Sequence, residues 1–128
     1  MRLIVALPLA LSAIAAPVCA APSAPAMTLD GTWTVDLSTD PAQPYTKPMV
    51  LALQPGGTVT GSFYESEILA GRWKTDRGRT CVSFRTTDGA GPYHTAACLV
   101  GDRVEGQTWA EQRNFLFNWN AARAVPVQ

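Results

Sequence analysis

The stretch "TLDGTWTVDL" (residues 28–37) decides the fold. Within it Trp33, Val35 and Leu37 share one face of an extended chain, and the residues between them are polar. Alternation with a period of two is typical of a β-strand that has one buried face. The sequence therefore predicts a strand over 31–37 that begins at Gly31 and turns Trp33 inward.

The same alternation recurs in short runs along the rest of the chain, and we find no convincing amphipathic helix. Turn residues separate the runs, as in "QPGG" (54–57) and "DGAGP" (88–92), a pattern typical of antiparallel all-β domains. The predicted strands are 31–37, 46–54, 57–65, 67–74, 79–86, 93–100, 102–111 and 114–123. Eight strands with short connections favour an all-β, eight-stranded antiparallel up-and-down barrel, whose closure removes the open sheet edges. A sandwich of two sheets is the alternative.

Several apolar positions align on the faces predicted to point inward. They are Met49, Leu51 and Leu53, then Val59 and Phe63, and finally Phe115, Phe117 and Trp119. An eight-stranded barrel has room either for a small ligand or for a lumen filled by its own side chains. Glycines inside predicted strands (Gly61, Gly71 and Gly106) indicate bulges or sharp corners.

The first residues, "MRLIVALPLALSAIAAPVCA", have the basic start, apolar run and small-residue exit of a secretory signal peptide. We expect cleavage near Ala20, a flexible leader over 21–28 and a barrel domain over 29–124, in a periplasmic or secreted protein without a membrane span in the mature chain. A lipoprotein alternative would use Cys19, although the residues before it fit that pattern poorly.

The two remaining cysteines fit an oxidising compartment. If the hairpin after Thr86 turns between Gly89 and Ala90, then Thr86 faces Tyr93, and Cys81 faces Cys98. Residues directly across a hairpin lie within disulfide reach, so we expect a Cys81–Cys98 bridge.

Charge and residue chemistry argue against several classes of partner. Lys and Arg together number 10, as do Asp and Glu, and no long block of one sign occurs, so we expect no nucleic acid or anionic membrane as partner. The cations of 72–79 are interrupted by Asp76 and are expected to solvate a hairpin. Zinc sites usually need several His or Cys ligands. The chain has a single histidine, His94, and its cysteines are expected to be bridged, so we expect no metal site and no cofactor.

"GTW" at the head of the first strand resembles the Gly-x-Trp signature of the calycins, the group that holds lipocalins and avidins. The resemblance implies that Trp33 closes one end of the barrel beneath an Arg from the end of the last strand, here Arg123. "GTVTGSFYES" (57–66) resembles an avidin segment in which Tyr and Ser bind the ligand, and Tyr64 and Ser66 are the nearest equivalents here, although Phe63 disturbs the phasing. Small periplasmic inhibitors of metalloproteases are similar barrels that act through an N-terminal segment.

We therefore predict an exported, non-enzymatic, calycin-like protein that sequesters a small, largely apolar molecule. The candidate ligand-binding residues are Tyr64, Glu65, Arg72, Tyr93, His94, Trp109 and Trp119; no catalytic residue is predicted. One alternative is a protease inhibitor that binds a protein partner through the leader or through loop 38–45. The other is a small isomerase or hydrolase with a carboxylate or Tyr in the lumen.

Overall fold

The computed structural model describes residues 10–17 and 28–125, and the second range forms an all-β barrel. Its strands are β1 (Gly31–Asp36), β2 (Thr46–Leu53), β3 (Thr58–Phe63), β4 (Ser66–Glu67), β5 (Leu69–Asp76), β6 (Arg79–Thr87), β7 (Pro92–Val100), β8 (Arg103–Ala110) and β9 (Phe115–Arg123). The described residues contain no helix.

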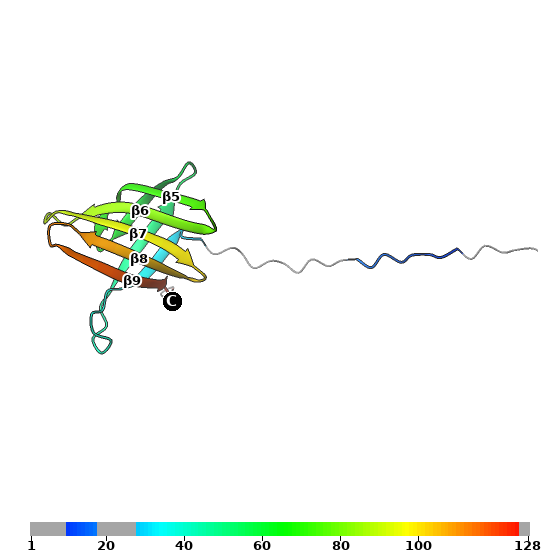
Figure 1. Ribbon diagram of the computed structural model, residues 1–128, viewed down its shortest axis with the longest axis horizontal. Coiled ribbons are helices and arrows are strands. Elements are labelled where there is room, and N and C mark those ends of the chain that lie inside the picture. The colour runs from blue at the N-terminus through cyan, green and yellow to red at the C-terminus, as the bar shows by residue number, and fades with distance from the viewer. Residues whose placement is uncertain (1–9, 18–27, 126–128) are drawn as a thin grey trace, which may run out of the picture.

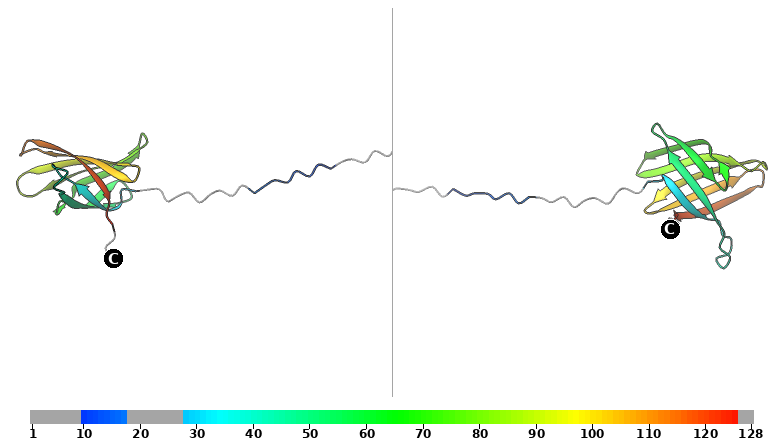
Figure 2. Two further views of the ribbon diagram at one scale, coloured as in Figure 1. Left: turned by 90° about the horizontal axis from the view of Figure 1, so that it is seen from below. Right: turned by 180° about the vertical axis from the view of Figure 1, so that it is seen from behind.

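The long strands follow one another around a closed antiparallel ring. β1 pairs with β2 on one side and with β9 on the other, so the first and last long strands meet. β2 pairs in turn with β3, which completes the ring through β5 to β9. In Figure 1 β5 to β9 form the near wall, and the view from behind in Figure 2 brings the early strands to the front. The predicted eight-stranded up-and-down barrel is confirmed.

The structure differs from the prediction between 64 and 76, where one strand was expected over 67–74. The two-residue strand β4 folds back on β3, and β5 begins only at Leu69. The register between β5 and β6 shifts between Leu69 and Arg72, and Ala70 has a φ of 53°. Gly71 fits this irregularity because an added Cβ would lie 2.3 Å from the Val59 carbonyl oxygen. The predicted corner at Gly71 is therefore present, and it divides the expected strand.

The inward faces of the strands form one apolar core. Its buried members include Val35, Met49, Leu51, Val59, Phe63, Val82, Phe84, Val104 and Trp119. Gly106 lies directly across from Trp119 in regular pairing, and an added Cβ would lie 2.3 Å from the indole ring. The glycine in β8 thus makes room for the indole and does not mark a bulge.

The hairpin of β6 and β7 has the predicted register. Thr86 pairs with Tyr93, and Cys81 pairs with Cys98. The two cysteines form a disulfide with a Cα–Cα distance of 4.0 Å. Cys81 directly precedes Val82, and Cys98 directly follows Ala97. Because Val82 and Ala97 face inward, the bridge lies on the outer face of the barrel.

One end of the barrel is closed by Trp33, whose side chain is fully buried. The Arg123 guanidinium lies 4.0 Å from the centre of the indole ring. It donates hydrogen bonds to the carbonyl oxygens of Asp30 and Thr28, while the Trp33 Nε1–H donates to the Leu29 carbonyl at 2.9 Å. Segment 28–30 is therefore hydrogen-bonded to side chains of both the first strand, β1, and the last strand, β9.

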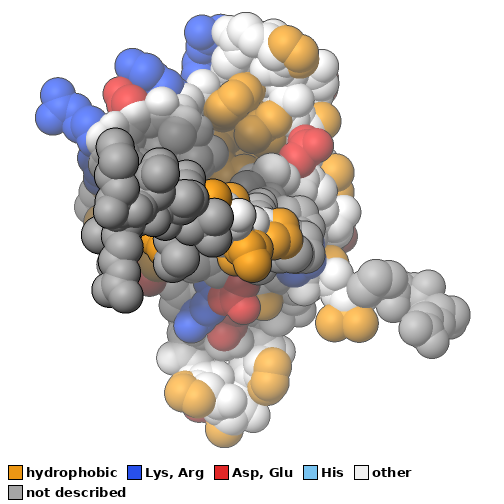
Figure 3. All heavy atoms as spheres, turned by 90° about the vertical axis from the view of Figure 1, so that its right-hand side faces the viewer, with side chains coloured by type: hydrophobic (Ala, Val, Ile, Leu, Met, Phe, Trp, Pro, Cys, Tyr) orange, Lys and Arg blue, Asp and Glu red, His pale blue; other side chains and the backbone are white. Residues whose placement is uncertain are grey.

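The cationic hairpin of β5 and β6 extends from this closed end. Arg72, Lys74, Arg77 and Arg79 are all exposed, and Lys74 lies 3.0 Å from Asp76. In the view onto this end, Lys and Arg side chains gather near the top of the molecule (Figure 3). The exposed side chains agree with the predicted solvated hairpin.

The predicted cleavage near Ala20, Cys19 and nearly all of the predicted leader lie outside the described residues. Residues 10–17 form no helix or strand. Across 10–17 and 28–125, no helix is long and apolar enough to span a membrane.

Candidate ligand-binding site

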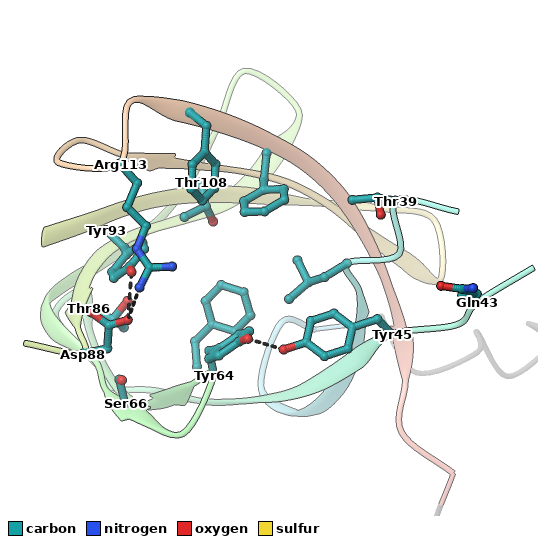
Figure 4. A pocket seen from close by; sticks show the side chains of 14 residues that line it. Thr39, Gln43, Tyr45, Tyr64, Ser66, Thr86, Asp88, Tyr93, Thr108 and Arg113 are labelled. Atoms are coloured by element: carbon teal, nitrogen blue, oxygen red, sulfur yellow. Dashed lines mark hydrogen bonds and ion pairs between the residues drawn. The ribbon is translucent and has the colours of Figure 1, made fainter. Parts of the chain in front are cut away.

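A cavity of about 440 Å³ lies at the end of the barrel opposite Trp33. The up-and-down order of the strands brings four connections to this end: 37–45, 64–65, 88–91 and 111–114. The side chains around the cavity therefore come from strands and loops far apart in sequence (Figure 4). Pockets of this size hold small organic molecules.

Apolar side chains form one part of the cavity wall. They are Leu37, Phe63, Phe115 and Phe117. The rings of Phe115 and Phe117 pack edge to face with centroids 4.6 Å apart. Phe63 in turn packs on Trp119, with centroids 5.5 Å apart. Trp119 is 3% exposed and donates its indole N–H to the Thr108 hydroxyl at 2.9 Å, so it lies beneath the cavity as part of its support.

A second part of the wall carries a polar cluster of Asp88, Tyr93 and Arg113. The Tyr93 hydroxyl donates to Asp88 Oδ2 at 2.8 Å, and Arg113 Nη2 lies 3.4 Å from the same oxygen. The backbone N–H of Ala90 donates to Asp88 Oδ1 at 2.9 Å. This backbone hydrogen bond, followed by the one from Tyr93, lowers the pKa of Asp88, whereas burial and the Asp88 carboxylate raise the pKa of Tyr93. Asp88 is therefore ionised and Tyr93 neutral around neutral pH.

The long loop 38–45 is joined to the β3–β4 turn at the mouth of the cavity. Tyr64 and Glu65 in that turn have φ values of 54° and 64°, as the two central residues of a type I′ hairpin turn do. The hydroxyls of Tyr45 and Tyr64 are hydrogen-bonded across the mouth, as Figure 4 shows. This contact, followed by burial, raises the pKa of Tyr64.

A lysine and a glutamate flank this contact. The Lys47 ammonium lies 5.0 Å from the centre of the Tyr64 ring and 3.7 Å from Glu65 Oε1. The Glu65 side chain is 77% exposed, so it lies at the edge of the mouth.

Two of the predicted site residues, Tyr64 and Tyr93, line the cavity. Trp119 supports it from below through Phe63, and Glu65 lies at its edge. These four residues are thus brought to the same end of the barrel.

The structure places the other three predicted site residues away from the cavity. His94 is on the outer face of β7, with Nε2 3.1 Å from Glu111 Oε2. Trp109 is on the outer face of β8 and 38% exposed. Arg72 pairs with Thr58 beside the β2–β3 turn, at the closed end. Their faces follow from strand alternation, because His94 and Trp109 are each next in sequence to an inward-facing residue.

Sequence reasoning missed Asp88, Arg113, Thr86 and Tyr45 as cavity residues. Strand alternation could have predicted that Thr86 faces inward, because it lies on the same face of β6 as Val82 and Phe84. Asp88 and Arg113 lie in different turns, and only the closed topology shows that these turns meet. Tyr45 is the last residue of the loop 38–45, and the sequence pattern does not give the path of this loop.

The described residues contain no group of three or more His, Cys, Asp or Glu side chains that could hold a metal ion. Comparisons of the chain with known protein families, with curated proteins and with solved structures found no match.

Proposed function

We propose that this chain is an exported, calycin-like binding protein that holds a small, largely apolar molecule in the cavity opposite Trp33. The observation that carries the proposal is the cavity itself, which has about 440 Å³ of space at one end of a closed barrel. Four apolar side chains and a few converging polar groups line it, which is the composition typical of small-molecule sites.

Other features agree with export and with the calycin resemblance. The N-terminal sequence has the pattern of a signal peptide, and a disulfide is favoured in an oxidising compartment. The contact of Arg123 with Trp33 agrees with the arrangement that the Gly-x-Trp resemblance implies.

The polar cluster supports binding over catalysis. Asp88 is the carboxylate among the residues around the cavity, and it already accepts hydrogen bonds from Ala90, Tyr93 and Arg113. A general acid or base needs a pKa near the working pH, whereas the pKa of Asp88 is lowered. The cluster is therefore better suited to orienting a ligand than to moving a proton.

The proposal is tested by titrating the mature chain with N-phenyl-1-naphthylamine, an apolar dye whose fluorescence rises in apolar surroundings. The variant Leu37→Trp adds bulk at a cavity residue, and we expect it to weaken dye binding at least tenfold. Leu116→Trp is the matched control, because Leu116 is 52% exposed on the outer face of β9. Absence of saturable dye binding, or equal loss in both folded variants, would contradict the proposal.

A further inference from the structure

The charged side chains in the cavity wall and at its mouth form ion pairs, each of one cation and one anion. Arg113 lies against Asp88, and Lys47 lies against Glu65 at the mouth. An anionic head group beside Arg113 would also meet the Asp88 carboxylate, and a cationic one beside Asp88 would meet the guanidinium. Removing either head group from water has a cost that only an unopposed partner charge offsets. The paired charges thus disfavour both anionic and cationic ligands.

A threonine hydroxyl on the same wall has no hydrogen-bond partner among the described residues. Thr86 is 4% exposed and lines the cavity, and its hydroxyl makes no hydrogen bond to any described residue. The other two buried threonines differ, because the hydroxyls of Thr95 and Thr108 lie 2.9 Å apart and Thr108 also accepts from Trp119. No fully enclosed side-chain oxygen or nitrogen of the described residues lacks a hydrogen-bond partner. The unpaired Thr86 hydroxyl is therefore open to the cavity that Thr86 lines, where it is available to a ligand.

Further polar groups lie near Thr86. Figure 4 places Thr86, Ser66 and Arg113 around the same side of the cavity as Asp88. A threonine hydroxyl both donates and accepts, and a guanidinium has five N–H donors. A ligand's carbonyl or hydroxyl oxygen could thus be hydrogen-bonded here without carrying a charge.

We infer that the cavity selects neutral molecules that have an apolar body and one uncharged hydrogen-bonding head group, such as an alcohol or amide, and that the Thr86 hydroxyl binds this head group. The inference rests on the proposed function. It goes further because it names the class of ligand and a residue that determines specificity.

The first test uses the wild-type chain and four molecules with the same eight-carbon chain: 1-octanol, octanamide, octanoate and octylammonium. Each competes with the bound naphthylamine dye. We expect the alcohol and the amide to bind about tenfold more tightly than either ion, which corresponds to about 1.4 kcal/mol. An ion that binds as tightly as the neutral molecules would overturn the inference, although dye binding would still support the proposed function.

The second test removes the hydroxyl with Thr86→Val, which keeps the shape of the side chain. We expect the affinity for octanamide and 1-octanol to fall about fivefold to tenfold, as for the loss of one buried hydrogen bond, and the affinity for naphthalene to stay the same. Thr86→Ser should retain most of the affinity for the alcohol and the amide. Thr60→Val is the matched control, since Thr60 is exposed on the outer face of β3.

The variants separate the two proposals. Equal affinities of wild type and Thr86→Val for octanamide would overturn the role of Thr86, whereas failure of wild type to bind dye and naphthalene would overturn the proposed function.

Discussion

The contact of Trp33 with Arg123 shows how a pair of residues holds the two ends of the sheet together. The two residues are direct neighbours across the β1–β9 pairing. The guanidinium lies over the indole ring and also donates to the backbone of residues 28 and 30. Arg123 therefore links the segment before β1 to the last strand. The two hydrogen bonds use two different nitrogens of the planar guanidinium, and the charge of this group lies over the indole ring.

This arrangement predicts that Arg123→Lys will be destabilising even though it conserves the charge. Lysine cannot reproduce the forked hydrogen bonds to two carbonyl oxygens, so we expect the free energy of unfolding to fall by about 1–2 kcal/mol. Urea denaturation measures the change. Arg103→Lys is the control, because Arg103 is an exposed residue at the start of β8; equal effects of the two substitutions would contradict the role of Arg123.

At the residue scale, strand alternation predicted which apolar side chains face inward. The expected inward positions Trp33, Met49 and Phe63 are buried. The same rule separates Tyr93 from His94, which are neighbours in sequence and therefore lie on opposite faces of β7. Residue type alone had suggested His94 and Trp109 as binding residues, and the face each occupies places them outside the cavity.

At the scale of elements, the sequence predicts regular hairpins better than irregular connections. The β6–β7 register followed from one turn position and is reproduced over the whole pairing from Cys81 to Thr87. The prediction for residues 64–71 was wrong, because their path depends on tertiary contacts. Ile68 shows this, since its N–H donates to the Gly61 carbonyl at 2.9 Å and its side chain is buried.

The contact between loop 38–45 and the β3–β4 turn predicts how the mouth of the cavity moves. Either Tyr45→Phe or Tyr64→Phe removes the hydrogen bond between their hydroxyls. We expect each variant to speed hydrogen exchange of the amides in 38–45 about twofold to fivefold, the effect of a hydrogen bond worth about 0.5–1 kcal/mol. The double variant should resemble the single ones, because the same bond is lost in all three.

Thr75→Val is the control for loop exchange. It breaks a similar hydroxyl pair, Thr75 with Thr80 at 2.7 Å, in the hairpin at the closed end. Faster exchange of 38–45 in this variant, or additive effects of the two tyrosine substitutions, would show that the tyrosine pair does not hold the loop.

At the scale of the whole molecule, the disulfide lies on the outer face of β6 and β7 near the closed end, whereas the cavity lies at the other end of these strands, beside Thr86 and Tyr93. Cys81 and Cys98 are half-buried on the outside, next to Val82 and Ala97 on the inside. The closed ring of paired strands provides the lumen, and the disulfide adds a covalent link between two strands that are already paired. Stability and ligand binding should therefore depend on the bridge to different extents.

Replacing both cysteines with serine separates these two properties. The bridge closes a loop with a sequence separation of 17, and in the chain-entropy account a loop of this length stabilises the fold by about 3 kcal/mol. We expect urea denaturation to show a loss of this size, while the affinity for the naphthylamine dye stays within about twofold in conditions where the variant is folded, a change of under half a kcal/mol. Ser83→Ala, at an exposed position on the same outer face of β6, should change neither quantity. If dye affinity fell together with stability in the folded variant, the bridge would be shaping the lumen, and the paired strands alone would not be enough to hold the cavity open.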